Sequence, residues 1–75
     1  MWLKVVYEGG VRIRSEPSAG APLQGEVLPR GYIFEAEEQQ AQEAEGSLLV
    51  RLCDKRGWVY ELKDGVRILQ RVDPP

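Results

Sequence analysis

The chain has 75 residues, of which 43% are hydrophobic and 29% are charged, and its formal net charge is −2. A chain this short buries only about 60% of its unfolded surface, which indicates one small domain over residues 1–75 and excludes a two-lobed enzyme. No apolar run approaches the ~18 residues of a membrane helix, and the acidic pI of about 5.1 excludes an overall positive field that would attract nucleic acid or acidic lipid.

The first half of the chain consists of short segments typical of β-strands. Residues 3–7 mix β-branched and aromatic side chains and end at a Glu-Gly-Gly turn. Residues 11–14 alternate strictly between apolar side chains and Arg, which predicts a half-buried strand. Residues 15–22 contain two prolines and are expected to form a stiff loop, because the residue before each proline is held in an extended geometry. Residues 23–28 predict a further short strand.

The second half begins with residues 32–37, which carry the strongest β signal in the chain. Residues 38–45 are rich in Gln, Glu and Ala, but eight residues are too few for an isolated helix. We therefore expect a long exposed loop or an extension of the strand there. Three more strands are expected at residues 48–52, 58–61 and 66–72. Turn signals at intervals of roughly 8–12 residues indicate a small all-β sandwich or barrel.

Alternation within these segments selects the side chains that would face inward. The expected core consists of Val5, Val11, Ile13, Val27, Ile33, Leu48, Val50, Leu52, Val59 and Ile68. A Gly-Val-Arg-Ile tetrapeptide also occurs twice, at residues 10–13 and 65–68. A single match of four residues favours chance or shared hairpin chemistry over equivalent barrel positions or the start of a tandem copy.

Three stretches match one family pattern in the right order. Residues 11–18 form an alternating segment that ends in Arg-Ser, one variable residue and Pro-Ser, residues 25–31 fit Gly-x-hydrophobic-x-x-Gly, and residues 49–59 contain Val-x-Leu, a polar turn and Gly-Trp-Val. The chain thereby resembles a bacterial-type Src-homology-3 (SH3b) domain over most of residues 5–60. The resemblance implies an all-β, small SH3-like, partly open barrel of five to six short antiparallel strands. The first loop holds no aromatic residue, unlike the proline-peptide groove of the eukaryotic members.

Aromatic residues are the first candidates for a contact surface. Trp58 and Tyr60 are two positions apart and share one face of their strand, while Val59 faces the other way. If Val59 is in the core, Trp58 and Tyr60 stand at or near the surface, where Tyr7 and Tyr32 could join them. Such a cluster could stack on a peptide, a sugar or a methylated cation, or it could simply cover one end of a small barrel.

Charged residues form two further groups. Acidic side chains gather in and around the expected long loop, at Glu35, Glu37, Glu38, Glu43 and Glu45. Beside aromatic groups they would steer a basic peptide, and otherwise they form a solvated loop that prevents edge-to-edge strand pairing. Basic side chains fall on outward positions of two strands, at Arg12, Arg14, Arg67 and Arg71. If those strands are neighbours, the four form a basic stripe, whose alternative is a solvated face with Arg stems covering apolar surface.

The chain contains few of the residue types and motifs that enzymes use in catalysis. The chain has no histidine, and Cys53 is its only cysteine, which excludes an internal disulfide, an all-protein zinc site and Cys–His catalysis. No Gly-rich phosphate loop or nucleophile elbow occurs. We therefore expect no enzymatic activity, no metal and no cofactor, and we expect Cys53 to be inert and partly buried.

The sequence thus predicts a non-catalytic binding module for a peptide or protein partner. The expected contact residues are Tyr7, Tyr32, Trp58 and Tyr60 for stacking, with Glu16, Glu37 and Glu38 for charge selection. The alternatives are recognition of cell-wall peptidoglycan glycan and an architectural spacer in a larger protein, and neither a nucleic acid nor a membrane is expected as a partner. A single unpaired cysteine and an N-terminal stretch without an apolar leader favour a cytoplasmic location, although the domain could belong to a longer or tandem-repeat protein.

Overall fold

Every element of the chain is a β-strand in the computed structural model, which describes residues 1–18, 20 and 23–75. The strands are β1 (Trp2–Val5), β2 (Val11–Arg14), β3 (Leu23–Leu28), β4 (Ile33–Ala44), β5 (Ser47–Leu52), β6 (Trp58–Lys63), β7 (Val66–Arg67) and β8 (Leu69–Val72). The expected all-β fold is confirmed. Eight short strands are present, more than the five or six expected.

Two segments account for most of the difference in strand number and length. Residues 38–45, expected as a loop or a strand extension, mostly continue β4, which runs to Ala44. The expected strand at residues 66–72 is divided at Ile68, whose N–H donates to the carbonyl of Glu61 while its carbonyl accepts from Val6 and Tyr7. Ile68 therefore joins β6 to the end of β1 and separates β7 from β8. The proline loop expected at residues 15–22 lies partly outside the described residues.

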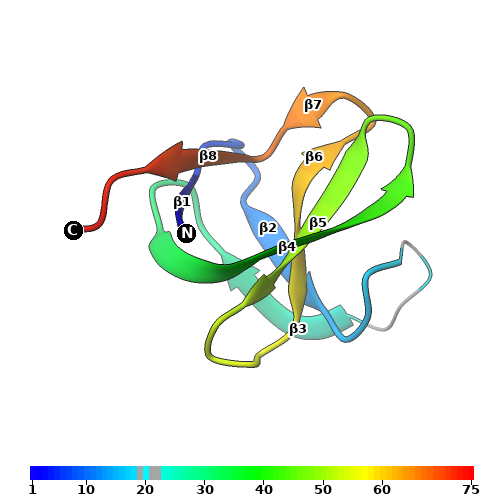
Figure 1. Cartoon of the computed structure of the whole chain (residues 1–75), viewed down its shortest axis with the longest axis horizontal. Helices are drawn as coiled ribbons and strands as arrows, with labels where there is room; N and C mark the ends of the chain where they lie inside the picture. Colours follow the sequence, from blue (N-terminus) through cyan, green and yellow to red (C-terminus); the bar gives the residue numbers. More distant parts are fainter. Residues whose placement is uncertain (19, 21–22) are drawn as a thin grey trace.

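The strands form one antiparallel sheet that curls into a half-barrel (Figure 1). Their order is β3-β2-β6-β5-β4-β1-β8, and β7 pairs with β6 beside this path. β4 belongs to both halves of the sheet, because its first residues pair with β1, as in Phe34↔Leu3, and the rest pairs with β5 from Ala36↔Leu52 onward. The bend between these two pairings curves the sheet around its core.

The concave side of the half-barrel holds a single apolar cluster. Its buried members come from every strand except β7, and they are Leu3, Val5, Val11, Ile13, Leu28, Phe34, Ala36, Leu49, Val50, Leu52, Val59, Tyr60, Ile68 and Leu69. Seven of the ten expected core residues are in this cluster, and Val59 is fully buried, as expected. The other three are corrections.

Val27 and Ile33 are 41% and 42% exposed, so their assignment to the core was wrong. In each case the next residue is apolar and takes the inward position, Leu28 after Val27 and Phe34 after Ile33. Successive side chains of a strand point to opposite faces, so two adjacent apolar residues leave the phase of the alternation open. Leu48 is only half-buried.

The error at Leu48 has a different cause. The pairing of β5 with β6 shifts by one residue between Leu48 and Leu49. Beyond the shift, Leu49 and Val50 are both fully buried although they are neighbours. β5 therefore departs, next to an irregularity in its pairing, from the strict alternation on which the expected core was based.

Candidate functional site

A groove of about 520 Å³ lies between β2 and the hairpin formed by β6 and β7. Its base includes the buried ring of Tyr60, and Val66 lies on its β7 side. Tyr7, from the turn after β1, and Val27, from β3, line it on the other side. Tyr7, Val27 and Val66 are 45%, 41% and 50% exposed. The rim of the groove is therefore apolar and exposed to solvent, and its floor is aromatic.

The groove exists because β6 is only partly paired along one edge. β5 covers the other edge, from Leu48↔Leu62 to Arg51↔Trp58. On the groove side β2 pairs with β6 at Arg14↔Trp58, and β7 pairs with it at Leu62 and Lys63. β2 stays with β3 while it diverges from β6, and the middle of β6, with Tyr60, lies in the space that opens.

Tyr60 was expected at or near the surface, and this expectation was wrong because the residue is only 3% exposed. Its hydroxyl donates a hydrogen bond of 2.8 Å to Oε1 of Glu43 on β4. Burial raises the pKa of Tyr60, and the nearby Glu43 carboxylate raises it further. The guanidinium carbon of Arg14 and Nζ of Lys63 lie 5.2 and 5.3 Å from the ring centroid, within the range of a cation–π contact.

The polar side chains of the groove are mostly basic. Arg12 and Arg14 come from β2 and Lys63 from the end of β6, and Asp64 is the single carboxylate among the described lining residues. Arg12 lies directly across the β2–β3 ladder from Val27, which brings a cation and an exposed apolar group together. The groove can therefore contact apolar and anionic groups of one ligand at the same time.

The structure brings two of the four predicted aromatic residues to this groove, Tyr7 and Tyr60. Trp58 is half-buried and packs against the apolar core. Tyr32 is 38% exposed, and its ring stacks on that of Phe34 with 6.2 Å between the centroids. Neither Trp58 nor Tyr32 is among the described residues that line the groove.

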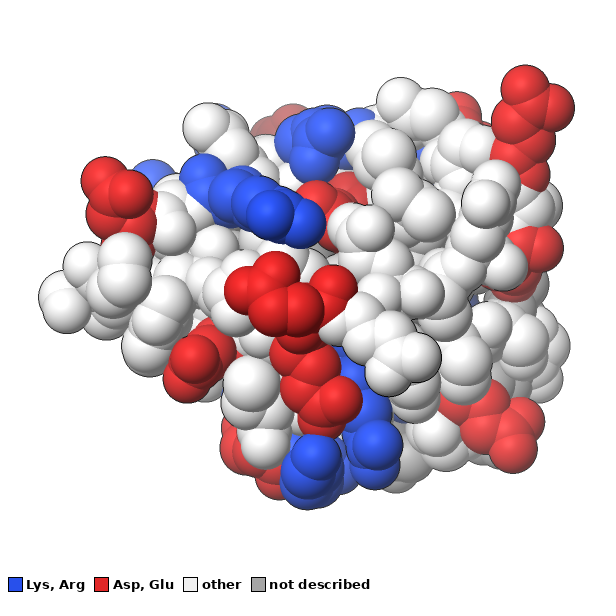
Figure 2. Space-filling model, viewed as in Figure 1, with Lys and Arg blue, Asp and Glu red and all other residues white. Residues whose placement is uncertain are grey.

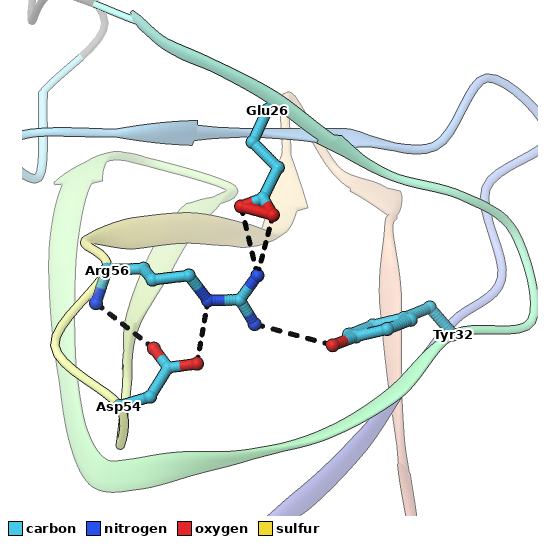
Figure 3. A network of polar contacts seen from close by, with 4 residues as sticks. All are labelled: Glu26, Tyr32, Asp54 and Arg56. Atoms are coloured by element: carbon cyan, nitrogen blue, oxygen red, sulfur yellow. Dashed lines mark hydrogen bonds and ion pairs between the residues drawn. The ribbon is translucent and has the colours of Figure 1, made fainter.

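The hydroxyl of Tyr32 belongs to a polar network centred on Arg56 (Figure 3). Nη1 of Arg56 donates to both carboxylate oxygens of Glu26 at 2.9 and 3.0 Å, Nε donates to Asp54 at 2.7 Å, and Nη2 donates to the Tyr32 oxygen at 3.4 Å. The backbone N–H of Arg56 also donates to Asp54 and, together with the guanidinium, lowers the pKa of Asp54. The network links β3, the β5–β6 turn and the residue that precedes β4.

The three acidic residues predicted for charge selection lie outside the groove lining. Glu16 is exposed in the loop after β2. Glu37 pairs with Nζ of Lys55 at 2.8 Å, a hydrogen bond that lowers the pKa of Glu37, and Glu38 lies 3.4 Å from the amino group of Met1. Figure 2 shows acidic side chains in the middle of the face that β4 crosses, with basic side chains above and below them.

The predicted basic stripe is divided by the topology. β2 pairs with β3 and β6, whereas β8, which carries Arg71, pairs with β1 near the opposite end of the sheet. Arg67 lies 3.6 Å from the buried carboxylate of Glu61 and also donates to the carbonyl of Leu69. Lys63 was missed as a site residue, since only the pairing of β6 with β7 places it beside Arg14 and Tyr60. The one local signal was the repeated Gly-Val-Arg-Ile tetrapeptide, since both copies contribute to the groove lining.

Other chemistry is sparse in the part of the chain that the structure describes. No three Asp, Glu, His or Cys side chains among residues 1–18, 20 and 23–75 are placed to hold a metal ion. Cys53 is exposed where the chain leaves β5, so the expectation that it is partly buried was wrong. Within the same residues no helix is long and apolar enough to cross a membrane. Comparison with protein-family models, curated proteins and solved structures found no match.

Proposed function

We propose that the chain is a non-catalytic binding module with an SH3-like fold, and that the groove binds a short segment of a peptide or protein partner. The observation that carries this proposal is the groove of about 520 Å³ with exposed Tyr7, Val27 and Val66 along its rim. Its volume is within the roughly 300–1,000 Å³ of ligand sites. Exposed apolar side chains gathered along one depression, with polar groups beside them, are typical of an interaction surface.

The shape of the groove favours an extended segment. It is bounded along one side by β2 and along the other by the β6–β7 hairpin, and the buried Tyr60 at its base is hydrogen-bonded to Glu43. A site of about 520 Å³ contacts few residues of its ligand, and so small an interface predicts micromolar affinity unless the module works in tandem.

The side chains of the groove support recognition more than bond cleavage. Its described lining contains one carboxylate, Asp64, and no Ser, Thr or Cys. The Tyr60 hydroxyl is engaged with Glu43 and its pKa is raised, which disfavours the phenolate. The Tyr60 hydroxyl lies beside a potential base, Glu43, but it is buried, so this pair is poorly placed for the nucleophilic attack that covalent catalysis needs.

A chemical-shift titration with pooled short peptides tests the proposal. We expect shifts at the amides of Tyr7, Val27 and Val66, and we expect Val66→Ser to weaken binding. Ile33→Ser is the matched control, because Ile33 is an exposed aliphatic strand residue outside the described groove lining, 42% exposed against 50% for Val66. Equal weakening by both variants, or silence at every groove amide, would overturn the proposal, and silence would favour an architectural spacer. If the protein sedimented with purified peptidoglycan, the ligand would be a cell-wall glycan and not a peptide.

A further inference from the structure

The groove has a charge opposite to that of the whole protein. The chain carries 12 acidic and 10 basic residues and a net charge of −2. The described lining of the groove contains three basic residues, Arg12, Arg14 and Lys63, and one acidic residue, Asp64. Charge complementarity between a groove and its ligand selects the partner and raises the association rate. The local excess of cations therefore points to an anionic ligand.

Two of these cations are available to a ligand. Lys55, Arg56 and Arg67, all outside the groove lining, are bound to carboxylates of the protein at 2.8, 2.9 and 3.6 Å. In contrast, no ion pair within residues 1–18, 20 and 23–75 includes Arg12 or Lys63. Among the described lining residues, Asp64 is the carboxylate that competes with a ligand for these cations.

The spacing of the cations fits an extended chain. Arg12 and Arg14 are two residues apart on β2, so they share one face of the strand about 6.6 Å apart. Alternate side chains of an extended peptide are separated by the same distance. An extended segment that runs along β2 can therefore place a carboxylate against Arg12 while its neighbouring side chains contact Val27 and Val66. Arg14 lies over the Tyr60 ring.

We propose that the ligand of the groove is an extended peptide segment in which carboxylates are interspersed with apolar side chains. The inference rests on the proposed function and replaces the basic peptide expected from the sequence. A peptide is favoured over a nucleic acid because only three cations occur among the described lining residues, apolar groups flank them, and the protein as a whole is acidic. Regularly spaced phosphates would require a longer basic track.

Three pooled libraries of short peptides test the inference by fluorescence anisotropy. The libraries share randomised apolar positions and differ only in the fixed alternate positions, which carry Glu, Gln or Lys. We expect the Glu library to bind about tenfold more tightly than the Gln library and the Lys library to bind most weakly, with the preference shrinking at high salt. Equal binding of the three libraries would overturn the inference and leave the proposed function intact. Failure of all three to bind would refute the proposed function itself.

Matched variants test which residues of the groove produce the preference for the Glu library. We expect Arg12→Gln and Lys63→Gln each to weaken binding of the Glu library about threefold, while Arg71→Gln, which removes the same charge from an exposed position on β8, has no effect. The double variant Arg12→Glu with Lys63→Glu should reverse the preference toward the Lys library. Circular dichroism confirms that each variant is folded. An unchanged preference in the double variant, or tighter binding of single-stranded DNA than of the Glu library, would overturn the inference.

Discussion

Tyr60 shows how one residue serves both the core and the groove. Its ring is buried in the apolar cluster and also forms the groove floor, and its hydroxyl is satisfied by Glu43. A buried hydroxyl without a partner would be costly, so the hydrogen bond makes it possible for an aromatic residue with a polar end to occupy this position. The long β4, which carries Glu43, thereby stabilises the floor of a groove formed by other strands.

Tyr60→Phe should lower the free energy of unfolding by about 1 kcal/mol at neutral pH, because the hydrogen bond is lost. The folded protein raises the pKa of Tyr60 above its ordinary value of 10.0. The corresponding stabilisation is complete below pH 10 and is lost as the pH rises through the folded pKa. Urea unfolding at neutral and alkaline pH should therefore show a smaller alkaline loss in Tyr60→Phe than in the wild type. Tyr7→Phe, which removes an exposed hydroxyl, is the control, and an alkaline loss in Tyr60→Phe as steep as that of the wild type would contradict the prediction.

Gly57 is a second residue whose identity is fixed by its surroundings. It begins the approach to β6 with a φ of +142°, and a Cβ there would collide with the carbonyl oxygen of Arg14 and lie 2.9 Å from Cγ2 of Ile13. Gly57→Ala should destabilise the fold by about 3 kcal/mol, since both the backbone conformation and the packing oppose a side chain. Gly65→Ala is the matched control, with a φ of +80° and no atom within 4 Å, and should cost about 1 kcal/mol. Urea midpoints measure both, and equal losses would disprove the steric explanation.

At the scale of elements, the polar network of Arg56 joins three parts of the chain. Glu26 lies on β3, Asp54 on the β5–β6 turn and Tyr32 just before β4. The side chains are 30 to 53% exposed in the ion pairs, so solvent screens the interaction. The network holds the turn in place but contributes modestly to stability.

Arg56→Met should therefore reduce the free energy of unfolding by only about 1 kcal/mol at low salt, and the difference from the wild type should shrink at high salt. The lowered pKa of Asp54 means that its contribution is present above its ordinary value of 3.8 and is lost as the pH falls through the folded pKa. Wild-type stability should thus decline in acid more than that of Asp54→Asn. Thermal unfolding against pH and salt tests both statements, with Arg30→Met as an exposed-charge control. A loss in Arg56→Met that high salt leaves unchanged would show that the network acts through packing.

The strands of the sheet could be predicted from the sequence only in part. The bounds of β2 and β3 follow from local alternation and turn residues, and both were predicted correctly. Whether Val27 and Ile33 face the core or the solvent could not be predicted, because each has an apolar neighbour that competes for the inward position. The bulge beside Leu49 depends on the pairing partner and leaves no local signal.

The groove was harder to predict than the strands. Its walls meet only because Arg14 pairs with Trp58 and β7 folds back on the end of β6. Periodicity reports which face of a strand is buried but not which strands are neighbours. Tyr7 and Tyr60 were therefore identified by residue type, whereas the role of Lys63 required the tertiary structure.

At the scale of the whole molecule, both halves of the curled sheet share one core, to which every strand except β7 contributes. A domain with a single contiguous core is expected to unfold in one cooperative step. Trp2 on β1 and Trp58 on β6 lie in different halves and are both partly buried. Each tryptophan can therefore report on its own half.

Single-tryptophan variants, Trp2→Phe and Trp58→Phe, should each give a fluorescence transition in urea that coincides with the transition by circular dichroism. The midpoints can differ between the variants, because each loses a different packed side chain, but the two probes should agree within each variant. Earlier loss of the Trp2 signal than of the circular dichroism would show that β1 and β8 detach on their own.

β6 hydrogen-bonds to three other strands, β2, β5 and β7. β5 covers one edge of β6 from Leu48↔Leu62 to Arg51↔Trp58, so opening the amides on that edge requires these two central strands to separate, an event close to global unfolding. In deuterated buffer the protons on these nitrogens should be the last to be replaced, while those at the outer edges of β3 and β8 are replaced first. A ligand seated between β2 and β7 would slow this replacement along the strand that the two walls share.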